Sequence, residues 1–148
     1  MKTWGEFAVA APDLAEKGRR LLYRTGSGEA LLVTVRGASL PRVHPVAVVE
    51  SQGGLYVFVL PSPKLGDLEQ DGRFAIHAYP DAEVPHEFQL RGRVRRVPGS
   101  KRDRLAADWP FDPGSAPAFE FLIADALLAE RASRSEWPPR YNRWTAGR

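Results

Sequence analysis

The segment RGASLPRVHPVAVVESQGGLYVFVLPSPKLGDL, residues 36–68, decides the fold that this sequence predicts. Arg42–Glu50 and Leu55–Leu60 are short runs rich in β-branched and aromatic residues, and a Gly-Gly pair separates them. This composition and spacing are typical of two strands joined by a tight turn. Ser62 is a good N-cap, so a helix is expected to begin at Pro63 and to run to about Glu69.

Outside this segment, strand-like runs alternate with turns and short helices. Four further runs predict strands: Ala30–Arg36, Arg73–Tyr79, Glu87–Val97 and Phe119–Arg131, the last with a bend near Asp125. Short helices are expected from Thr3 to about Ala10, from Pro12 to Tyr23 and from Ser100 to Ala107. The economical architecture is mainly β: a six-stranded antiparallel barrel with short flanking helices.

Length and composition limit the possible classes of protein. The chain has 148 residues, which suits a single domain over residues 1–148, and its formal net charge is +3. It contains no cysteine, no apolar run long enough for a membrane span and no signal-peptide pattern, so we expect a cytoplasmic protein. The positive charge is too sparse to indicate a nucleic-acid partner.

Two short stretches carry the candidate chemistry. Arg42 and His44 share one face of their strand, and Pro45 beside them cannot donate a ladder hydrogen bond, so this end of the strand is an edge or a bulge. Ser62 and Lys64 lie at a helix N-terminus, where free N–H groups and the helix dipole attract a phosphate. The alternative for Ser62 and Lys64 is an ordinary cap and a solvated lysine. His44 is either a donor to a flat heterocycle, a general acid, or a half-buried strand histidine.

The remaining residues do not indicate metal or nucleotide chemistry. His77 and His86 do not form metal-ligand spacing with His44, so no metal site is predicted. The sequence contains no P-loop, no nucleophile elbow and no G-x-G-x-x-G motif. The polar face of the Glu87–Val97 strand carries arginines without aromatic residues between them, which favours a solvated or interface face over a nucleic-acid surface.

Taken together, these segments resemble the pyridoxamine 5′-phosphate oxidase-like family. The matching residues are, in chain order, Ala30–Arg36, Pro41–Val46, Leu55–Phe58, Ser62–Lys64, Asp67–Leu68, Asp71–His77, Glu87–Phe88 and Gly92–Val94. The resemblance covers about residues 4 to 131 and rests on the ordered set, because no single motif is diagnostic. Members of the family are flavin-binding split barrels, mostly homodimers that hold FMN at the dimer interface.

The resemblance implies a cofactor site and an activity. The residues that would line the flavin are Arg42, Val43, His44 and Pro45; those that would bind its phosphate are Ser62 and Lys64; those that could close the site, from the same or the other subunit, are Arg93 and Trp144. The implied activity is that of an FMN-dependent oxidoreductase, with hydride transfer between the flavin and a small-molecule substrate. No acid–base pair stands out, so no catalytic residue is assigned.

The C-terminal part departs from the family pattern. Arg140–Trp144 lacks the Arg-Leu-x-Pro segment of true pyridoxamine phosphate oxidases, so that particular reaction is not expected. Relatives of this size use the deazaflavin F420 or bind haem, which leaves two alternatives: an F420-dependent reductase, or a non-catalytic flavin- or haem-binding protein involved in storage or stress response. The aromatic residues of segment 133–148 are expected to pack on the barrel or on a partner subunit.

Overall fold

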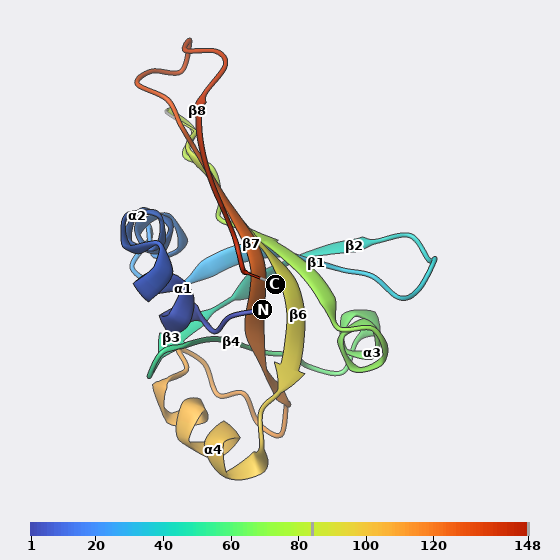
Figure 1. Cartoon of the computed structure of the whole chain (residues 1–148). Coiled ribbons are helices and arrows are strands. Elements are labelled where there is room, and N and C mark those ends of the chain that lie inside the picture. Colours follow the sequence, from blue (N-terminus) through green and yellow to red (C-terminus); the bar gives the residue numbers. More distant parts are fainter. Residues whose placement is uncertain (84, 148) are drawn as a thin grey trace.

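The structure is a computed structural model, and it describes residues 1–83 and 85–147. The strands are β1 (Glu29–Thr34), β2 (Arg42–Ala47), β3 (Val49–Ser51), β4 (Gly54–Phe58), β5 (Arg73–His77), β6 (Glu87–Arg96), β7 (Ala118–Glu130) and β8 (Arg140–Thr145). They form one sheet in the order β2-β1-β5-β6-β7-β4-β3, with β8 also on β7, and every neighbouring pair is antiparallel. Figure 1 shows this sheet curling into a half-barrel, so the predicted mainly-β, antiparallel fold class is confirmed.

The sheet has eight strands where the sequence indicated six. The run Arg42–Glu50 is divided at Val48, because β2 pairs with β1 whereas β3 pairs with β4. At this corner the Val48 N–H donates to the Gly28 carbonyl (3.0 Å), and a Cβ on Gly28 would lie 2.1 Å from the Val48 carbonyl oxygen. Gly28 therefore lets the chain change its pairing partner. The other addition, β8, has no apolar alternation that would have indicated a strand.

Four helices flank the sheet in the described residues: α1 (Trp4–Ala10), α2 (Pro12–Leu22), α3 (Pro63–Gln70) and α4 (Gly99–Asp108). The predicted capping box of α1 is present, since Thr3 Oγ1 accepts from the Glu6 N–H at 3.2 Å and Glu6 Oε2 accepts from the Thr3 N–H at 2.8 Å. Of the helices in the ranges above, none is long and apolar enough to cross a membrane.

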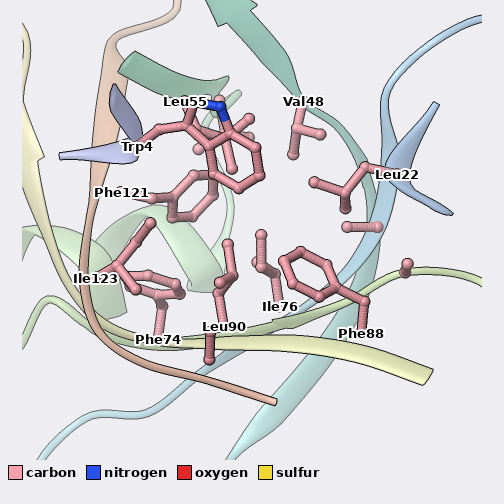
Figure 2. Packing of buried hydrophobic residues seen from close by; sticks show 14 of the residues in the cluster. Trp4, Leu22, Val48, Leu55, Phe74, Ile76, Phe88, Leu90, Phe121 and Ile123 are labelled. Atoms are coloured by element: carbon pink, nitrogen blue, oxygen red, sulfur yellow. The ribbon is translucent and has the colours of Figure 1, made fainter. Parts of the chain in front are cut away.

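The core lies between the curled sheet and the two N-terminal helices. Figure 2 shows Phe121 and Ile123 of β7 facing Phe74 and Ile76 of β5, with Trp4 closing one side. The Phe74 and Phe121 rings lie 4.7 Å apart between centroids. These residues point inward from alternate positions of their strands, as the period-2 pattern predicted.

The bend predicted in the Phe119–Arg131 strand is also present. Arg91 of β6 pairs with Asp125, but Gly92 pairs with Ile123, so β7 carries one extra residue between them. A Cβ on Gly92 would lie 1.9 Å from the Leu122 carbonyl oxygen, so the two backbones can approach this closely only at a glycine. The bulge turns β7 and gives the sheet its curvature.

Gly18 on α2 gives a test of helix-to-sheet packing. A Cβ there would lie 2.3 Å from the ring of the buried Phe88 of β6, whereas a Cβ on Gly99 of α4 would meet no atom within 4 Å. We expect Gly18→Ala to lower the free energy of unfolding by about 1–2 kcal/mol, because overpacking outweighs the gain in helix propensity. Gly99→Ala should leave it unchanged or raise it. Urea unfolding of both variants measures this, and equal stability of the two would contradict the close packing.

Candidate functional site

The N-terminus of α3 is built as the sequence predicted. Ser62 is the N-cap: its Oγ accepts from the Leu65 N–H at 3.4 Å and donates to the Leu60 carbonyl at 2.9 Å. Pro63 occupies the first helical position, and half-buried Lys64 follows it. No acidic residue lies in the first turn, so the positive end of the helix dipole and Lys64 act together.

A buried carboxylate, Asp67, organises the arginines beside this helix end. The Asp67 side chain is 1% exposed, and its Oδ2 accepts from Thr34 Oγ1 at 2.8 Å and from Arg42 Nε at 3.2 Å. Its Oδ1 lies 3.3 Å from Arg36 Nε. Arg36 follows β1 and Arg42 opens β2, so one carboxylate holds both sides of the β1–β2 hairpin to α3.

The resulting cluster has an excess of positive charge and unsatisfied polar atoms. Arg36, Arg42 and Lys64 carry three positive charges against the single negative charge of Asp67. Of the five buried side-chain nitrogen and oxygen atoms without a hydrogen-bond partner among the described residues, three belong here: Arg36 Nε, His44 Nε2 and Asp67 Oδ1. The Arg36 and Asp67 atoms form an ion pair whose angles are unsuitable for a hydrogen bond. Buried polar atoms without partners are uncommon and often mark a place where another group binds.

His44 is held in its neutral form by this surrounding. Burial is the largest cause that lowers its pKa, the charges of Lys64 and Arg42 lower it further, and Asp67 opposes them. Both ring nitrogens of a neutral histidine can take part in hydrogen bonds, one as donor and one as acceptor. At neutral pH, His44 can therefore present an uncharged nitrogen to a ligand.

The lowered pKa of His44 predicts a pH effect on stability. As the pH falls below about 6.5, the unfolded chain protonates this histidine before the folded chain does. The contribution of His44 to the free energy of unfolding is therefore fully present above that pH and is lost as the pH falls below it. The variant His44→Gln should lose less stability than the wild type between pH 7 and pH 5. Thermal unfolding at several pH values tests this, and parallel curves for the two proteins would contradict it.

Lys64 also lines a mainly apolar groove. Its volume is about 280 Å³, and it is lined chiefly by β2, the end of β4 and the loop between α4 and β7: Pro45, Val46, Ala47, Phe58, Leu60, Lys64, Trp109, Phe111, Asp112, Pro113 and Ala116. Trp109 and Phe58 meet edge to face, with ring centroids 4.7 Å apart. The only charged groups in the lining are Lys64 and Asp112. The groove thus offers mainly apolar walls with one cation, Lys64, and one carboxylate, Asp112, in its lining.

The structure brings most of the predicted site residues to one region. Arg42, His44, Ser62 and Lys64 surround the N-terminal end of α3, and Pro45 lines the adjoining groove. Val43, which is 61% exposed, lies on β2 between Arg42 and His44.

Arg93 and Trp144 lie elsewhere in the single chain. Arg93 Nη1 donates to the carbonyl of Asp71, the C-cap of α3, which is about 12 Å from the N-terminal end of that helix. Trp144 of β8 packs against Phe7 of α1, with ring centroids 4.9 Å apart. Neither residue joins Ser62 and Lys64 within one chain, so each could serve the site only from a second subunit.

Two of the three arginines on the outer face of β6, Arg91 and Arg95, form ion pairs with acids of β7. Arg91 donates to Asp125 at 2.9 and 2.8 Å, and Arg95 donates to the buried Glu120 at 3.2 and 2.5 Å. The hydrogen bonds that each arginine donates to its carboxylate partner raise the pKa of that arginine. This face is a ladder of ion pairs across β6 and β7, and β7 supplies the acids that the pattern of β6 alone did not reveal.

The two tryptophans of the C-terminal segment differ in their packing. Trp144 packs against Phe7 of α1, whereas Trp137 is 73% exposed at the far end of the β7–β8 hairpin, beneath the guanidinium of Arg131. Figure 1 shows this hairpin projecting from the half-barrel. On its own chain, Trp137 therefore meets the cation of Arg131 and little apolar surface.

Sequence reasoning missed several residues of the site. Thr34 and Arg36 belong to the β1–β2 hairpin and Asp67 to α3, and only the fold shows that they meet. Trp109 and Phe111 were noted only as aromatic residues in a loop. The sequence did carry a signal for Asp67. This carboxylate lies in the second turn of the predicted helix, directly before the apolar Leu68, which faces the core.

Comparisons with known proteins identify the fold. No family model matches the sequence, and neither does any curated protein. A haem-binding protein from Mycobacterium smegmatis has a similar structure, with a TM-score of 0.65, 18% identity and coverage of 89% of this chain and 57% of that one. PhzG from Burkholderia lata 383, in complex with tetrahydrophenazine-1-carboxylic acid, is also similar. Its TM-score is 0.70, its identity is 10%, and the match covers 92% of this chain and 86% of that one.

A third similar structure carries the name that the sequence suggested. It is a protein from Clostridium acetobutylicum related to general stress protein 26 of B. subtilis, described as of the pyridoxinephosphate oxidase family; the TM-score is 0.61, the identity is 12%, and the match covers 95% of both chains. The chain therefore has the split-barrel fold of the pyridoxamine 5′-phosphate oxidase-like proteins, as the resemblance implied. It spans 57% of the length of the haem-binding protein named above.

Proposed function

We propose that this protein is an FMN-dependent oxidoreductase that acts as a homodimer on a small-molecule substrate. The observation that carries the proposal is the cationic cluster of net charge +2 at the N-terminus of α3, continuous through Lys64 with a flat apolar groove. FMN joins a phosphate to a flat ring system, so its two ends match these two surfaces.

The residues present fit the parts of FMN. Phosphate oxygens are acceptors, and the cluster supplies donors: the guanidinium groups of Arg36 and Arg42, the ammonium of Lys64 and the free N–H groups of the first turn of α3. His44 precedes Pro45, which lines the groove, and its buried Nε2 has no hydrogen-bond partner among the described residues. Phe58 and Trp109 provide apolar surface for a flat ring.

The dimer in this proposal follows from the size and the rim of the groove. Its 280 Å³ is slightly below the usual range of about 300–1,000 Å³ for sites that enclose a ligand, so one chain would cover only part of FMN. Val43, Leu60 and Phe111 are 61%, 65% and 67% exposed and lie on or beside the groove wall. A second copy would bury them and complete the site, and light scattering should give twice the 16.4 kDa of one chain.

The protein's own residues bind and orient in this proposal. Bound flavin would supply the hydride chemistry. The cations neutralise the phosphate, the apolar groove excludes water from the ring, and His44 offers a neutral nitrogen near the groove. No described side chain has the position and the shifted pKa of a dedicated general base, so the chain contributes positioning and electrostatics.

A second candidate is haem binding without redox turnover of a substrate. It is favoured by the unpartnered Nε2 of His44, which is an atom type that ligates haem iron, and by the haem-binding protein among the similar structures. The cluster of cations would then meet the carboxylates of the haem. Loss of the Soret band on His44→Ala, with FMN binding absent, would select this candidate.

Titration of purified protein with cofactors tests the proposal. FMN fluorescence should be quenched at micromolar concentration and visible flavin absorbance should co-purify or reconstitute. Addition of F420 in competition separates the proposal from an F420-dependent reductase, which a clear preference for F420 would indicate. Turnover of a reduced nicotinamide with the loaded protein would exclude a purely storage role. Absence of binding by either flavin would overturn the proposal.

A further inference from the structure

Arg36 lies against the first turns of α3 in a position that only a glycine allows. A Cβ on Gly66 would lie 2.2 Å from Arg36 Nη2 and 3.3 Å from its Cζ. Gly66 is two residues after Lys64, so the guanidinium lies against the first half of α3, on a different face of the helix from the Lys64 Cβ. The Arg36 side chain is still 42% exposed, which leaves part of it open to a ligand.

Asp67 fixes the direction in which both arginines point. Arg36 and Arg42 each turn Nε toward this carboxylate, at 3.3 and 3.2 Å. A guanidinium has five N–H donors, and this arrangement uses the Nε side, so the terminal Nη groups remain for another acceptor. Thr34 Oγ1 donates to Asp67 at 2.8 Å from the buried end of β1 and holds the carboxylate itself in place.

The charge of the cluster matches one particular class of anion. Three cations and one carboxylate leave a net charge of +2 around a partly open site. A phosphomonoester carries about −1.5 to −2 at pH 7, whereas a phosphodiester carries −1. A diester would leave one positive charge of the cluster unneutralised.

We propose that Arg36 is a third phosphate-binding cation of this site, that Asp67 is the positioning residue that aims Arg36 and Arg42 at the ligand, and that the site selects a dianionic phosphomonoester. This inference rests on the proposed function for the identity of the flavin, but it concerns the phosphate end alone. The other reading of the same contacts is a set of ion pairs that only stabilises the hairpin.

The affinity of flavin-free protein for FMN and for riboflavin separates these readings, because riboflavin lacks the phosphate. Arg36→Gln should weaken FMN binding about 10- to 100-fold and leave riboflavin binding unchanged, as expected for loss of a charge-assisted hydrogen bond. Arg36→Lys should restore part of the loss, because it returns the charge without the planar fork. FMN binding by Arg36→Gln at wild-type affinity would overturn the inference.

Gly66→Ala is a matched variant that changes no charge. The added methyl group displaces the flexible guanidinium end of Arg36, while alanine favours the helix, so the protein should be at least as stable as the wild type. We expect its FMN affinity to fall about 10-fold with riboflavin affinity unchanged. A purely stabilising role for Arg36 predicts reduced thermal stability and no selective loss of FMN, and that pattern would also overturn the inference.

Asp67→Asn should change FMN affinity in opposite directions for a positioning role and for a role of net charge alone. Removal of the carboxylate raises the net charge to +3, so a site that acts by charge alone would bind FMN more tightly. A site that depends on the aim of two arginines should bind FMN about 10-fold more weakly, and this is the result we expect. Tighter binding would overturn the positioning role of Asp67.

Inorganic phosphate distinguishes failure of this inference from failure of the proposed function. If neither flavin binds, but inorganic phosphate raises the thermal unfolding temperature of the wild type and not of Arg36→Gln or Gly66→Ala, the phosphomonoester site stands and the flavin function fails. Potassium chloride at equal ionic strength is the control. If phosphate stabilises no protein beyond that control and neither flavin binds, both fail.

Discussion

Replacement of Phe121 by alanine should lower the free energy of unfolding by about 3–5 kcal/mol. The side chain is fully buried on β7 and its ring packs 4.7 Å from that of Phe74, in the centre of the core that Figure 2 shows. The loss comprises the transfer of a large apolar group and the cavity left behind. It is a large part of the roughly 5–15 kcal/mol that stabilises a typical domain. For a chain of this length, the melting temperature should fall by roughly 6–20 °C.

Val9→Ala is the control for this measurement. Val9 on α1 is 85% exposed, so its truncation should change the free energy of unfolding by less than about 0.5 kcal/mol. Chemical unfolding followed by circular dichroism measures both variants. A loss below about 1 kcal/mol for Phe121→Ala would mean that the curled sheet does not enclose its core as described.

The second large effect concerns ligand affinity. Lys64→Gln should weaken FMN binding about 10- to 150-fold, because one charge-assisted hydrogen bond contributes about 1.5–3 kcal/mol. The double variant Lys64→Gln/Arg42→Gln should weaken it by about 10² to 10⁴, with departure from additivity because both cations face one phosphate. Quenching of FMN fluorescence measures these affinities, and riboflavin affinity should stay unchanged.

Lys17→Gln is the matched control for these variants. Lys17 on α2 pairs with Glu130 at 3.2 Å and is remote from α3, so its loss removes the same charge from the chain without touching the site. Equal weakening of FMN binding by Lys17→Gln and Lys64→Gln would show a general charge effect. That result would contradict a phosphate site at the N-terminus of α3.

Much of the fold was predictable because its signals are local. Alternation of apolar residues indicated the strands, the Thr3–Glu6 pair indicated α1, and Ser62-Pro63 indicated α3. The two extra strands arise from tertiary context. The corner at Val48 depends on the neighbouring Gly28. The strand β8 is polar, and it forms because it pairs with β7, which its own sequence does not indicate.

The candidate site was predictable at its helix end and not at its centre. Ser62 and Lys64 are adjacent in sequence and share a cap, so their chemistry can be read locally. Asp67 is effective because Thr34, Arg36 and Arg42 reach it from a hairpin more than 20 residues away in the chain. The pairing of Arg91 and Arg95 with acids on β7 was hidden for the same reason, since each strand shows only half of the ladder.

The place of β2 at the margin of the sheet bears on the risk of aggregation. An edge strand is a template on which foreign strands can add, and here that strand carries Pro45, which removes one donor, and the cation Arg42. Extension of this sheet into a continuous intermolecular one is therefore disfavoured. Two copies that meet near β2 are then expected to pack side chains face to face and not to add strand to strand. Such a contact can close as a dimer instead of growing into a fibre.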